Sequence, residues 1–231
     1  MKENKSSNKT YRSSINKMAT TAVFIALAYI ATCGFHIKVQ FLTLDIKDSL
    51  IAVAAMLFGP ISAVVISLAV SLIEMFTISE TYLYGFIMNV LSTVSFCCTA
   101  SIIYKYKRNI IGAVVGMISG VFAMTATMMI ANLLITPFYM GVTVKEVAFL
   151  IPKLLLPFNF TKALLNASVV MIIYKPISTA LRRMGVMKKG SLDSYRFDKR
   201  TVLVTVMAAA VTVISLVVFF VVLGGDIVFW I

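Results

Sequence analysis

Seven stretches of apolar residues, divided by short polar segments, set the pattern of this chain. They lie at about 18–35, 49–58, 60–78, 85–104, 110–135, 157–180 and 201–223. A membrane-spanning helix needs about 20 apolar residues, so all but the stretch at 49–58 are long enough to cross a bilayer. Gly59-Pro60 follows that short stretch and predicts a tight turn between two helices. The pattern indicates an all-α integral membrane protein.

The composition agrees with a membrane protein. Of the 231 residues, 60% are apolar and 13% are charged, whereas soluble domains average about 45–50% and about 25%. These values exclude a soluble enzyme, a disordered tail and a disulfide-stapled mini-domain. Cys33, Cys97 and Cys98 all lie in apolar stretches, where they are expected to pack as small side chains. Any function must therefore reside in the bundle or its short loops.

The net charge is +12, and the positions of the basic residues predict how the chain is oriented in the membrane. If the N-terminus is cytoplasmic, 16 of the 21 Lys and Arg residues fall in inner segments, at 1–17, 105–108 and 175–200. Cytoplasmic loops carry an excess of these residues, so this orientation is predicted. The charge is spread over several loops and forms no single patch, which argues against a nucleic-acid partner.

The chain is predicted to have four regions. Residues 1–17 form a basic cytoplasmic tail without the features of a cleavable signal peptide. Residues 18–182 form a six-helix membrane domain that holds the candidate binding residues, and 183–200 form a charged cytoplasmic linker. Residues 201–231 form an additional membrane helix with a short outer tail. This helix carries no charge or amide along 201–223, so it is expected to be an anchor.

Polar side chains within apolar stretches are costly in lipid, so each marks a candidate site. Asn159, Lys162 and Asn166 are spaced i, i+3 and i+7, which places two amides and an ammonium on one helical stripe. Such groups can bind the edge of a flat, polar ligand. The alternative is that Lys162 extends to the outer surface, and the binding stripe is favoured because two amides do not help such a lysine.

Three other polar positions remain open. Asn132 and Asn89 lie in two further stretches, and each is either a ligand contact or a hydrogen bond between helices. Glu74 has no evident partner and receives no role.

The segment 35–48 is polar at its end and apolar in its middle, so it can fold over a pocket as a lid. Phe41 and Thr43 would then face the ligand. Asp45 and Asp48 are expected to cap a helix or anchor the loop, not to form an acid/base pair.

No enzyme motif is present, such as HExxH, a phosphate-binding loop or GxSxG. The single histidine, His36, excludes a multi-histidine metal site and is expected to be solvated. We expect no catalytic residue, metal or cofactor. Without an ATP-binding element, the chain cannot energise pumping by itself.

Small residues recur at helical spacing in two places. Ala22 and Ala26 are spaced i, i+4, which suits either packing inside the bundle or a docking surface for another protein. Gly112, Gly116 and Gly120 repeat in the same way, and internal packing is the better explanation for them.

Four motifs also follow one another in a familiar order. They are Leu44-Asp45-Ile46-Lys47-Asp48, Phe58-Gly59-Pro60, Ala123-Met124-Thr125 leading to Asn132 and Pro137, and Pro157-Phe158-Asn159-x-x-Lys162. Over about residues 18–182 the chain resembles the substrate-binding (S) subunits of energy-coupling factor (ECF) vitamin transporters. The similarity is greatest to the riboflavin-specific members, and the last motif carries most of it.

The resemblance implies a six-helix S-component bundle in a bacterial cell membrane, here with one extra C-terminal helix. It implies high-affinity capture of riboflavin near the outer face, for ATP-driven uptake. Asn132, Asn159 and Lys162 would bond the flavin, and Asn89 also matches a family asparagine.

The resemblance also implies partners. Ala22 and Ala26 match the family's docking pattern for a transmembrane coupling subunit that carries two ATPase subunits. The chain departs from the family at Ala163, where glycine is usual, at Lys47 and the loop before Phe41, and in the extra helix.

Three other functions compete with this interpretation. An S subunit for pantothenate, flavin mononucleotide, a modified base or another vitamin would keep the family and change the ligand. A stand-alone secondary transporter would need coupling-ion groups or a continuous polar path, and neither is evident. A membrane assembly protein would use its amides only for structure.

Overall fold

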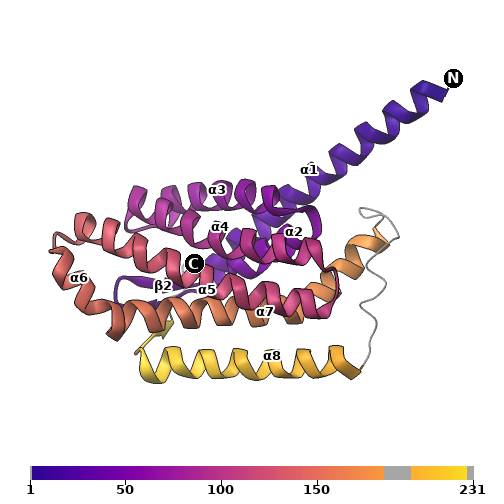
Figure 1. Ribbon diagram of the computed structural model, residues 1–231. Helices are drawn as coiled ribbons and strands as arrows, with labels where there is room; N and C mark the ends of the chain where they lie inside the picture. The colour runs from indigo at the N-terminus through magenta and orange to yellow at the C-terminus, as the bar shows by residue number, and fades with distance from the viewer. Residues whose placement is uncertain (1, 185–198, 228–231) are drawn as a thin grey trace.

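The computed structural model describes residues 2–184 and 199–227, which are mostly helical (Figure 1). The elements in order are α1 (Lys2–Gly34), β1 (Ile37–Val39), β2 (Leu42–Leu44), α2 (Lys47–Phe58), α3 (Pro60–Thr77), α4 (Tyr82–Tyr106), α5 (Ile110–Met140), α6 (Val144–Leu150), the π-helical turn η1 (Ile151–Leu155), α7 (Leu156–Arg183), α8 (Lys199–Val217), the π-helical turn η2 (Val218–Val222) and β3 (Asp226–Ile227). Every apolar stretch of the sequence therefore forms a helix.

Six helical segments of the described residues are long and apolar enough to cross a membrane. They are the Ile15–Gly34 part of α1, then α3, α4, α5, the continuous segment from α6 to α7, and α8 with η2. The remaining helix, α2, has only 12 residues, as its short apolar stretch predicts. The predicted fold class, an all-α membrane bundle with an additional C-terminal helix, is confirmed.

The predicted turn at Gly59-Pro60 is present. Gly59 has a φ angle of 102°, a left-handed conformation that glycine adopts without the steric cost of a Cβ. Pro60 opens α3, where its missing N–H costs no helical hydrogen bond. These two residues let α2 and α3 pack against each other as separate helices.

Two features of the predicted domain organisation can be compared with the structure: the boundary at 17/18 and the linker at 183–200. Helix α1 runs unbroken from Lys2, so the first of these boundaries falls inside a helix that extends beyond the bundle (Figure 1). Most of the predicted linker, residues 185–198, lies outside the described residues.

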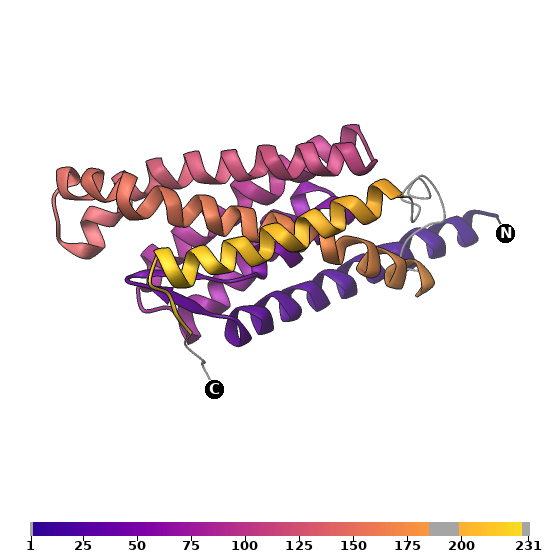
Figure 2. The same cartoon turned by 90° about the horizontal axis from the view of Figure 1, so that it is seen from below.

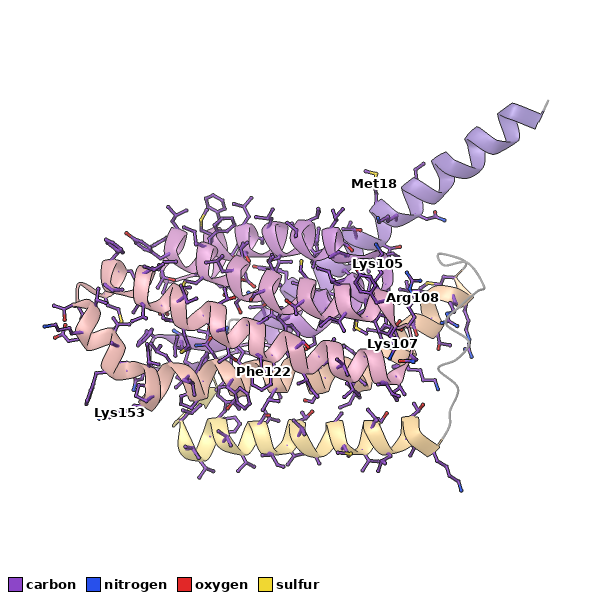
Figure 3. The ribbon with its side chains drawn as sticks, viewed as in Figure 1. Met18, Lys105, Lys107, Arg108, Phe122 and Lys153 are labelled. Carbon is purple, nitrogen blue, oxygen red and sulfur yellow. The ribbon has the colours of Figure 1, made fainter. Side chains whose placement is uncertain are left out.

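The two ends of the bundle differ in charge and structure (Figures 2 and 3). Lys105, Lys107 and Arg108 lie at the end from which α1 projects, which we name the basic end. Lys153, α6 and the β1–β2 hairpin lie at the opposite end, which we name the hairpin end. These three residues, which the sequence assigns to the inner side of the membrane, therefore share one end of the molecule.

Close packing of α4 against α5 depends on glycines. A Cβ on Gly116 would lie 2.8 Å from the carbonyl oxygen of Ala100, and one on Gly120 would lie 3.0 Å from that of Phe96. Both distances are below normal contact, so only glycine permits this approach. Internal packing, the explanation preferred from the sequence, accounts for both residues.

The segment 35–48 forms a hairpin. Strands β1 and β2 pair antiparallel with Ile37 opposite Leu44 and Val39 opposite Leu42, and Gln40 turns between them at a φ of 55°. The C-terminal strand β3 pairs with the other edge of β1, so the sheet order is β2-β1-β3. The sequence predicts a loop over segment 35–48 and none of these three strands.

Candidate functional site

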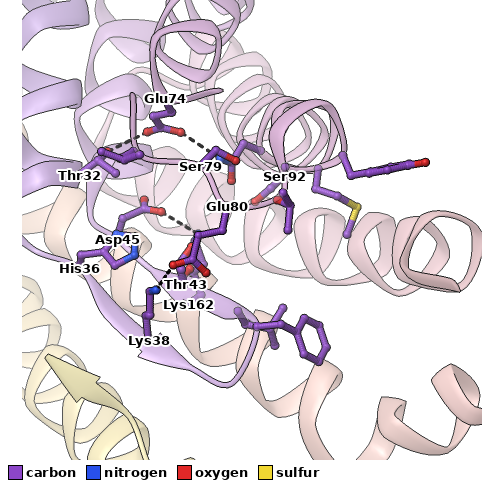
Figure 4. Close-up of a pocket in the computed structure, with 18 of the residues that line it drawn as sticks. Thr32, His36, Lys38, Thr43, Asp45, Glu74, Ser79, Glu80, Ser92 and Lys162 are labelled. Carbon is purple, nitrogen blue, oxygen red and sulfur yellow. Dashed lines mark hydrogen bonds and ion pairs between the residues drawn. The ribbon is translucent and has the colours of Figure 1, made fainter. Parts of the chain in front are cut away.

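A cavity of about 170 Å³ lies beside the hairpin, among the ends of α3, α4, α5 and α7 (Figure 4). Its wall combines aromatic rings with buried charged and amide groups, the usual composition of a small-molecule site. Rings from the hairpin and from two helices meet there, with 6.2 Å between the centroids of Phe41 and Tyr139 and 6.0 Å between those of Tyr84 and Tyr139.

Five of the seven predicted binding residues line this cavity, namely Phe41, Thr43, Asn89, Asn159 and Lys162. They come from β2 and its turn, from α4 and from α7, so the fold brings together segments more than 100 residues apart. The other two, Asn132 and Asn166, are buried outside the lining. Contact of any of these residues with a ligand stays a prediction.

Lys162 is buried and does not extend to the surface, which corrects the alternative considered for it. Its Nζ donates to Asp45 Oδ2 at 2.9 Å and to the carbonyl oxygen of Thr43 at 3.1 Å. An ammonium has three N–H donors, so one remains for a molecule in the cavity. Lys162 thus joins α7 to the hairpin and also faces the pocket (Figure 4).

Asn132 on α5 and Asn159 on α7 differ in how many hydrogen-bonding groups remain available to a ligand. Asn159 Nδ2 donates to the carbonyl oxygen of Leu155 at 2.7 Å, and no described residue binds its Oδ1. Asn132 donates to Met128 O at 2.7 Å and accepts from Thr136 at 2.9 Å, both within α5. Asn159 therefore keeps an acceptor for a ligand, whereas Asn132 satisfies both its side-chain oxygen and one N–H inside its own helix.

Asn166 holds the bundle together. Its oxygen accepts from the backbone N–H and the hydroxyl of Ser49, at 2.9 and 2.7 Å, and its Nδ2 donates to the carbonyl oxygens of Asp45 and Lys162. The Ser49 N–H belongs to the first turn of α2, where it also reaches the carbonyl oxygen of Ile46 at 3.2 Å. The predicted stripe is therefore divided: Asn159 and Lys162 face the cavity, and Asn166 ties α7 to the start of α2.

A buried ion pair lies in the same wall and gives Glu74 the partner that was not evident in the sequence. Lys47 and Glu74 are both almost fully buried, and 2.5 Å separates the Lys47 Nζ from the Glu74 Oε2. Thr32 donates to the other carboxylate oxygen, and Asn89 donates to Oε2, each at 3.0 Å. Glu74, which had no evident partner in the sequence, thus joins α1, α2 and α4. Lys47, one of the five Lys and Arg residues outside the inner segments, was expected near the outer face but is buried inside the protein.

Asp45 links this pair to Lys162. Its carboxylate lies 2.9 Å from the Lys162 Nζ and 4.0 Å from the Lys47 Nζ. Burial favours the protonated form of Asp45, but the two ammonium groups outweigh burial and hold its pKa below the ordinary value. Asp45 is therefore ionised at neutral pH. It also accepts from the Lys47 N–H, which is the predicted anchoring role.

Two other predictions for this segment have mixed outcomes. Asp48 does not cap α2 through its side chain but accepts from Thr93 on α4 at 2.5 Å, so it anchors α2 to α4. His36 is buried, not solvated. Burial, helped by the nearby lysines, outweighs the opposing effect of Asp45 and lowers the pKa of His36, so the ring is neutral at pH 7.

The alanines of α1 lie on an exposed face. Ala22 and Ala26 are exposed, whereas Phe24 and Ala28 on the same helix are buried. No other part of the described chain covers these two alanines, so a partner protein could contact them. The docking role stays a prediction.

Comparison with known proteins gives matches of three kinds: a family model, a curated relative and a solved structure. The family model for the substrate-specific component of ECF transporters matches residues 16–174. The riboflavin transporter RibU of Staphylococcus aureus (strain TCH60) is 28% identical over 178 residues, which are 73% of this chain and 93% of that protein. A solved S component of a bacterial ECF transporter is 27% identical with a TM-score of 0.63, over 74% of this chain and 99% of the other.

Proposed function

The chain belongs to the substrate-specific components of ECF transporters, and we propose that it captures riboflavin in the cavity beside the hairpin. The observation that carries this proposal is the meeting of Asn159, Lys162 and Asn89 with aromatic rings around one cavity. The similarity to a protein named as a riboflavin transporter supports this ligand.

The wall suits the chemistry of riboflavin. The molecule has a flat ring system with amide and imide groups along one edge and a polyhydroxyl chain. Aromatic side chains such as Phe41, Tyr84 and Tyr139 can stack on the ring face. The third N–H of Lys162 and the oxygen of Asn159 can bond the polar edge or the hydroxyls.

Recognition would depend mainly on satisfying buried polar groups. A molecule that lacks a matching partner leaves such a group desolvated, which costs about 1–3 kcal/mol for each group. This physical reason makes the hydrogen-bonding side chains the residues that select the ligand.

We also propose the orientation and the partners. The hairpin end faces outward and the basic end faces the cytoplasm, because Lys105, Lys107 and Arg108 then lie on the inner side. The exposed Ala22 and Ala26 face would dock onto the transmembrane coupling subunit, and the two ATPase subunits would supply the energy.

Purification in detergent tests the ligand directly. The protein is expected to quench riboflavin fluorescence in a saturable titration, with one molecule bound to each chain. Asn159→Ala is the sharpest variant, because the only described hydrogen bond of that side chain lies within its own helix. It should raise Kd at least about fivefold, since one hydrogen bond contributes about 1 kcal/mol.

Lys162→Ala should raise Kd more, by about tenfold or beyond, because hydrogen bonds to charged groups contribute about 1.5–3 kcal/mol. The matched control is Lys153→Ala, an exposed lysine at the same end of the bundle. Flavin mononucleotide and pantothenate serve as competitors. Riboflavin that binds equally well to all three variants, or a stronger competition by pantothenate, would reject the assignment.

A further inference from the structure

The C-terminal extension, residues 199–227 with α8, η2 and β3, packs against the binding domain. Figures 1 and 2 both show α8 along α7. One stripe of the extension is buried, formed by Thr201, Ala208, Ser215 and Phe219. Ser168 on α7 and Thr212 on α8 share a hydrogen bond of 2.8 Å between their hydroxyls. The extension is therefore more than the plain anchor helix expected from its composition.

The buried stripe ends at the wall of the cavity. Phe219 is fully buried, and its ring meets that of Phe158 edge-on, with 5.4 Å between centroids. Phe158 lines the cavity next to Asn159. Phe219 also belongs to one apolar cluster with Ile37 and Val39 of the hairpin. A residue outside the family match thus supports both the pocket wall and the hairpin.

Beyond η2 the chain turns back and joins the hairpin as strand β3. Ile37 lies opposite Ile227, and Lys38 lies opposite Asp226, so β1 becomes the central strand of the sheet. Gly225 permits the approach, because a Cβ there would lie 2.8 Å from the Ile37 Cγ2 and 3.0 Å from the Phe219 carbonyl oxygen. Without β3, one edge of β1 would lose its backbone partners.

The hairpin is held from two other sides as well. Lys38 forms an ion pair with Glu80 of the α3–α4 loop. Lys162 donates to the carbonyl oxygen of Thr43 in β2. The extension supplies a third attachment, on the edge that these two contacts do not reach.

The family match ends at residue 174, before the extension begins. The solved S component is matched over 99% of its length by only 74% of this chain. The extension thus lies outside the part of the chain that the family model matches.

We propose that the C-terminal extension is a positioning element of the binding site, which holds the hairpin over the cavity and slows the exit of a captured molecule. The effect on exit rests on the proposed function. The effect on the hairpin does not, because it depends only on strand pairing and on the packing of Phe219.

The test uses the purified chain with three changes. A chain that ends at Gly224 lacks β3, Phe219→Ala removes the contact with Phe158, and Gly225→Val blocks the approach of β3 to Ile37. The matched control is Phe220→Ala, because Phe220 is the next residue and is exposed. Two measurements are made on each protein: hydrogen exchange of the amides at 37–39, and the rate at which bound riboflavin is released after dilution.

The shortened chain and Gly225→Val are expected to exchange the β1 amides at least tenfold faster than the control. Phe219→Ala should release riboflavin about three- to tenfold faster, the size expected for loss of one aromatic pair. If all three variants match Phe220→Ala in both measurements, the positioning role is wrong.

The two proposals can fail separately. If the intact protein binds no riboflavin, the proposed ligand is wrong, and amide exchange alone decides the role of the extension. If riboflavin binds tightly while exchange and release are unchanged, the ligand stands and the positioning role is refuted. A shortened chain that does not fold leaves the decision to Phe219→Ala and Gly225→Val, which keep the full length.

Discussion

Glu74→Gln tests the buried ion pair in the cavity wall. The substitution keeps the size of the side chain and its contact with Thr32, but it removes the negative charge beside Lys47. The side chains of Lys47 and Glu74 are 2% and 3% exposed, so water compensates little for the lost partner. Lys47 would keep Asp45, whose carboxylate is 4.0 Å from its Nζ, and the weaker attraction of Asp48.

The expected cost follows from this burial. Removing one partner of a buried ion pair costs about 3–5 kcal/mol, because an uncompensated charge stays in the interior. The remaining attraction of Asp45 places Glu74→Gln near the lower value, at about 3 kcal/mol. The matched control is Glu80→Gln, which breaks the pair with Lys38. There the side chains are 26% and 66% exposed, and exposed pairs contribute less than about 1 kcal/mol.

Thermal unfolding of both variants in detergent, followed by circular dichroism, measures the difference. Glu74→Gln should lower the midpoint clearly more than Glu80→Gln. The double variant Glu74→Gln with Lys47→Met should recover much of the loss, since it removes both charges from the interior. Equal midpoints for Glu74→Gln and Glu80→Gln would refute the reasoning.

Two further predictions concern the hairpin and the docking face. The folded pKa of Asp45 is below its unfolded value, so its stabilisation is present above the ordinary carboxyl value of about 4 and is lost as pH falls through the folded pKa. Asp45→Asn should therefore lower stability at pH 7 and flatten the loss of stability in acid, and an unchanged acid profile would contradict this. Ala22→Leu and Ala26→Leu should leave riboflavin binding unchanged but abolish uptake by cells that express the complete transporter, because the added side chains separate the docked surfaces. Normal uptake would reject the docking face.

The helices could be predicted from the sequence because a membrane helix is a local property. The length of each apolar stretch predicts the length of its helix, and Gly59-Pro60 predicts the turn between α2 and α3. The placement of Asn159 and Lys162 on one face follows from a spacing of three residues, and the structure does bring both to the cavity. Asn166 fits the same spacing, yet its hydrogen bonds go to α2 and the hairpin.

The charged part of the wall could not be read from local spacing. Lys47 and Glu74 are 27 residues apart and meet only because α2 and α3 fold back at Gly59. The available signal was chemical: an ionised side chain in an apolar stretch needs a partner of opposite charge. The strand β3 gave no signal at all, since two residues carry no periodicity and their partner β1 lies near the other end of the chain.

Lys162 is where the proposed capture and the closure of the hairpin meet. Two of its donors hold the hairpin, through Thr43 and Asp45, and the third faces the cavity. A ligand that bonds this third donor adds a contact to a side chain already fixed by the hairpin, so it gains the contact with little further loss of side-chain entropy. Conversely, any movement that lifts the hairpin breaks the Lys162 contacts and loosens the group that would hold the ligand. Opening the hairpin and releasing the ligand are then one event, and β3 and Phe219 would slow both together by holding β1 in place.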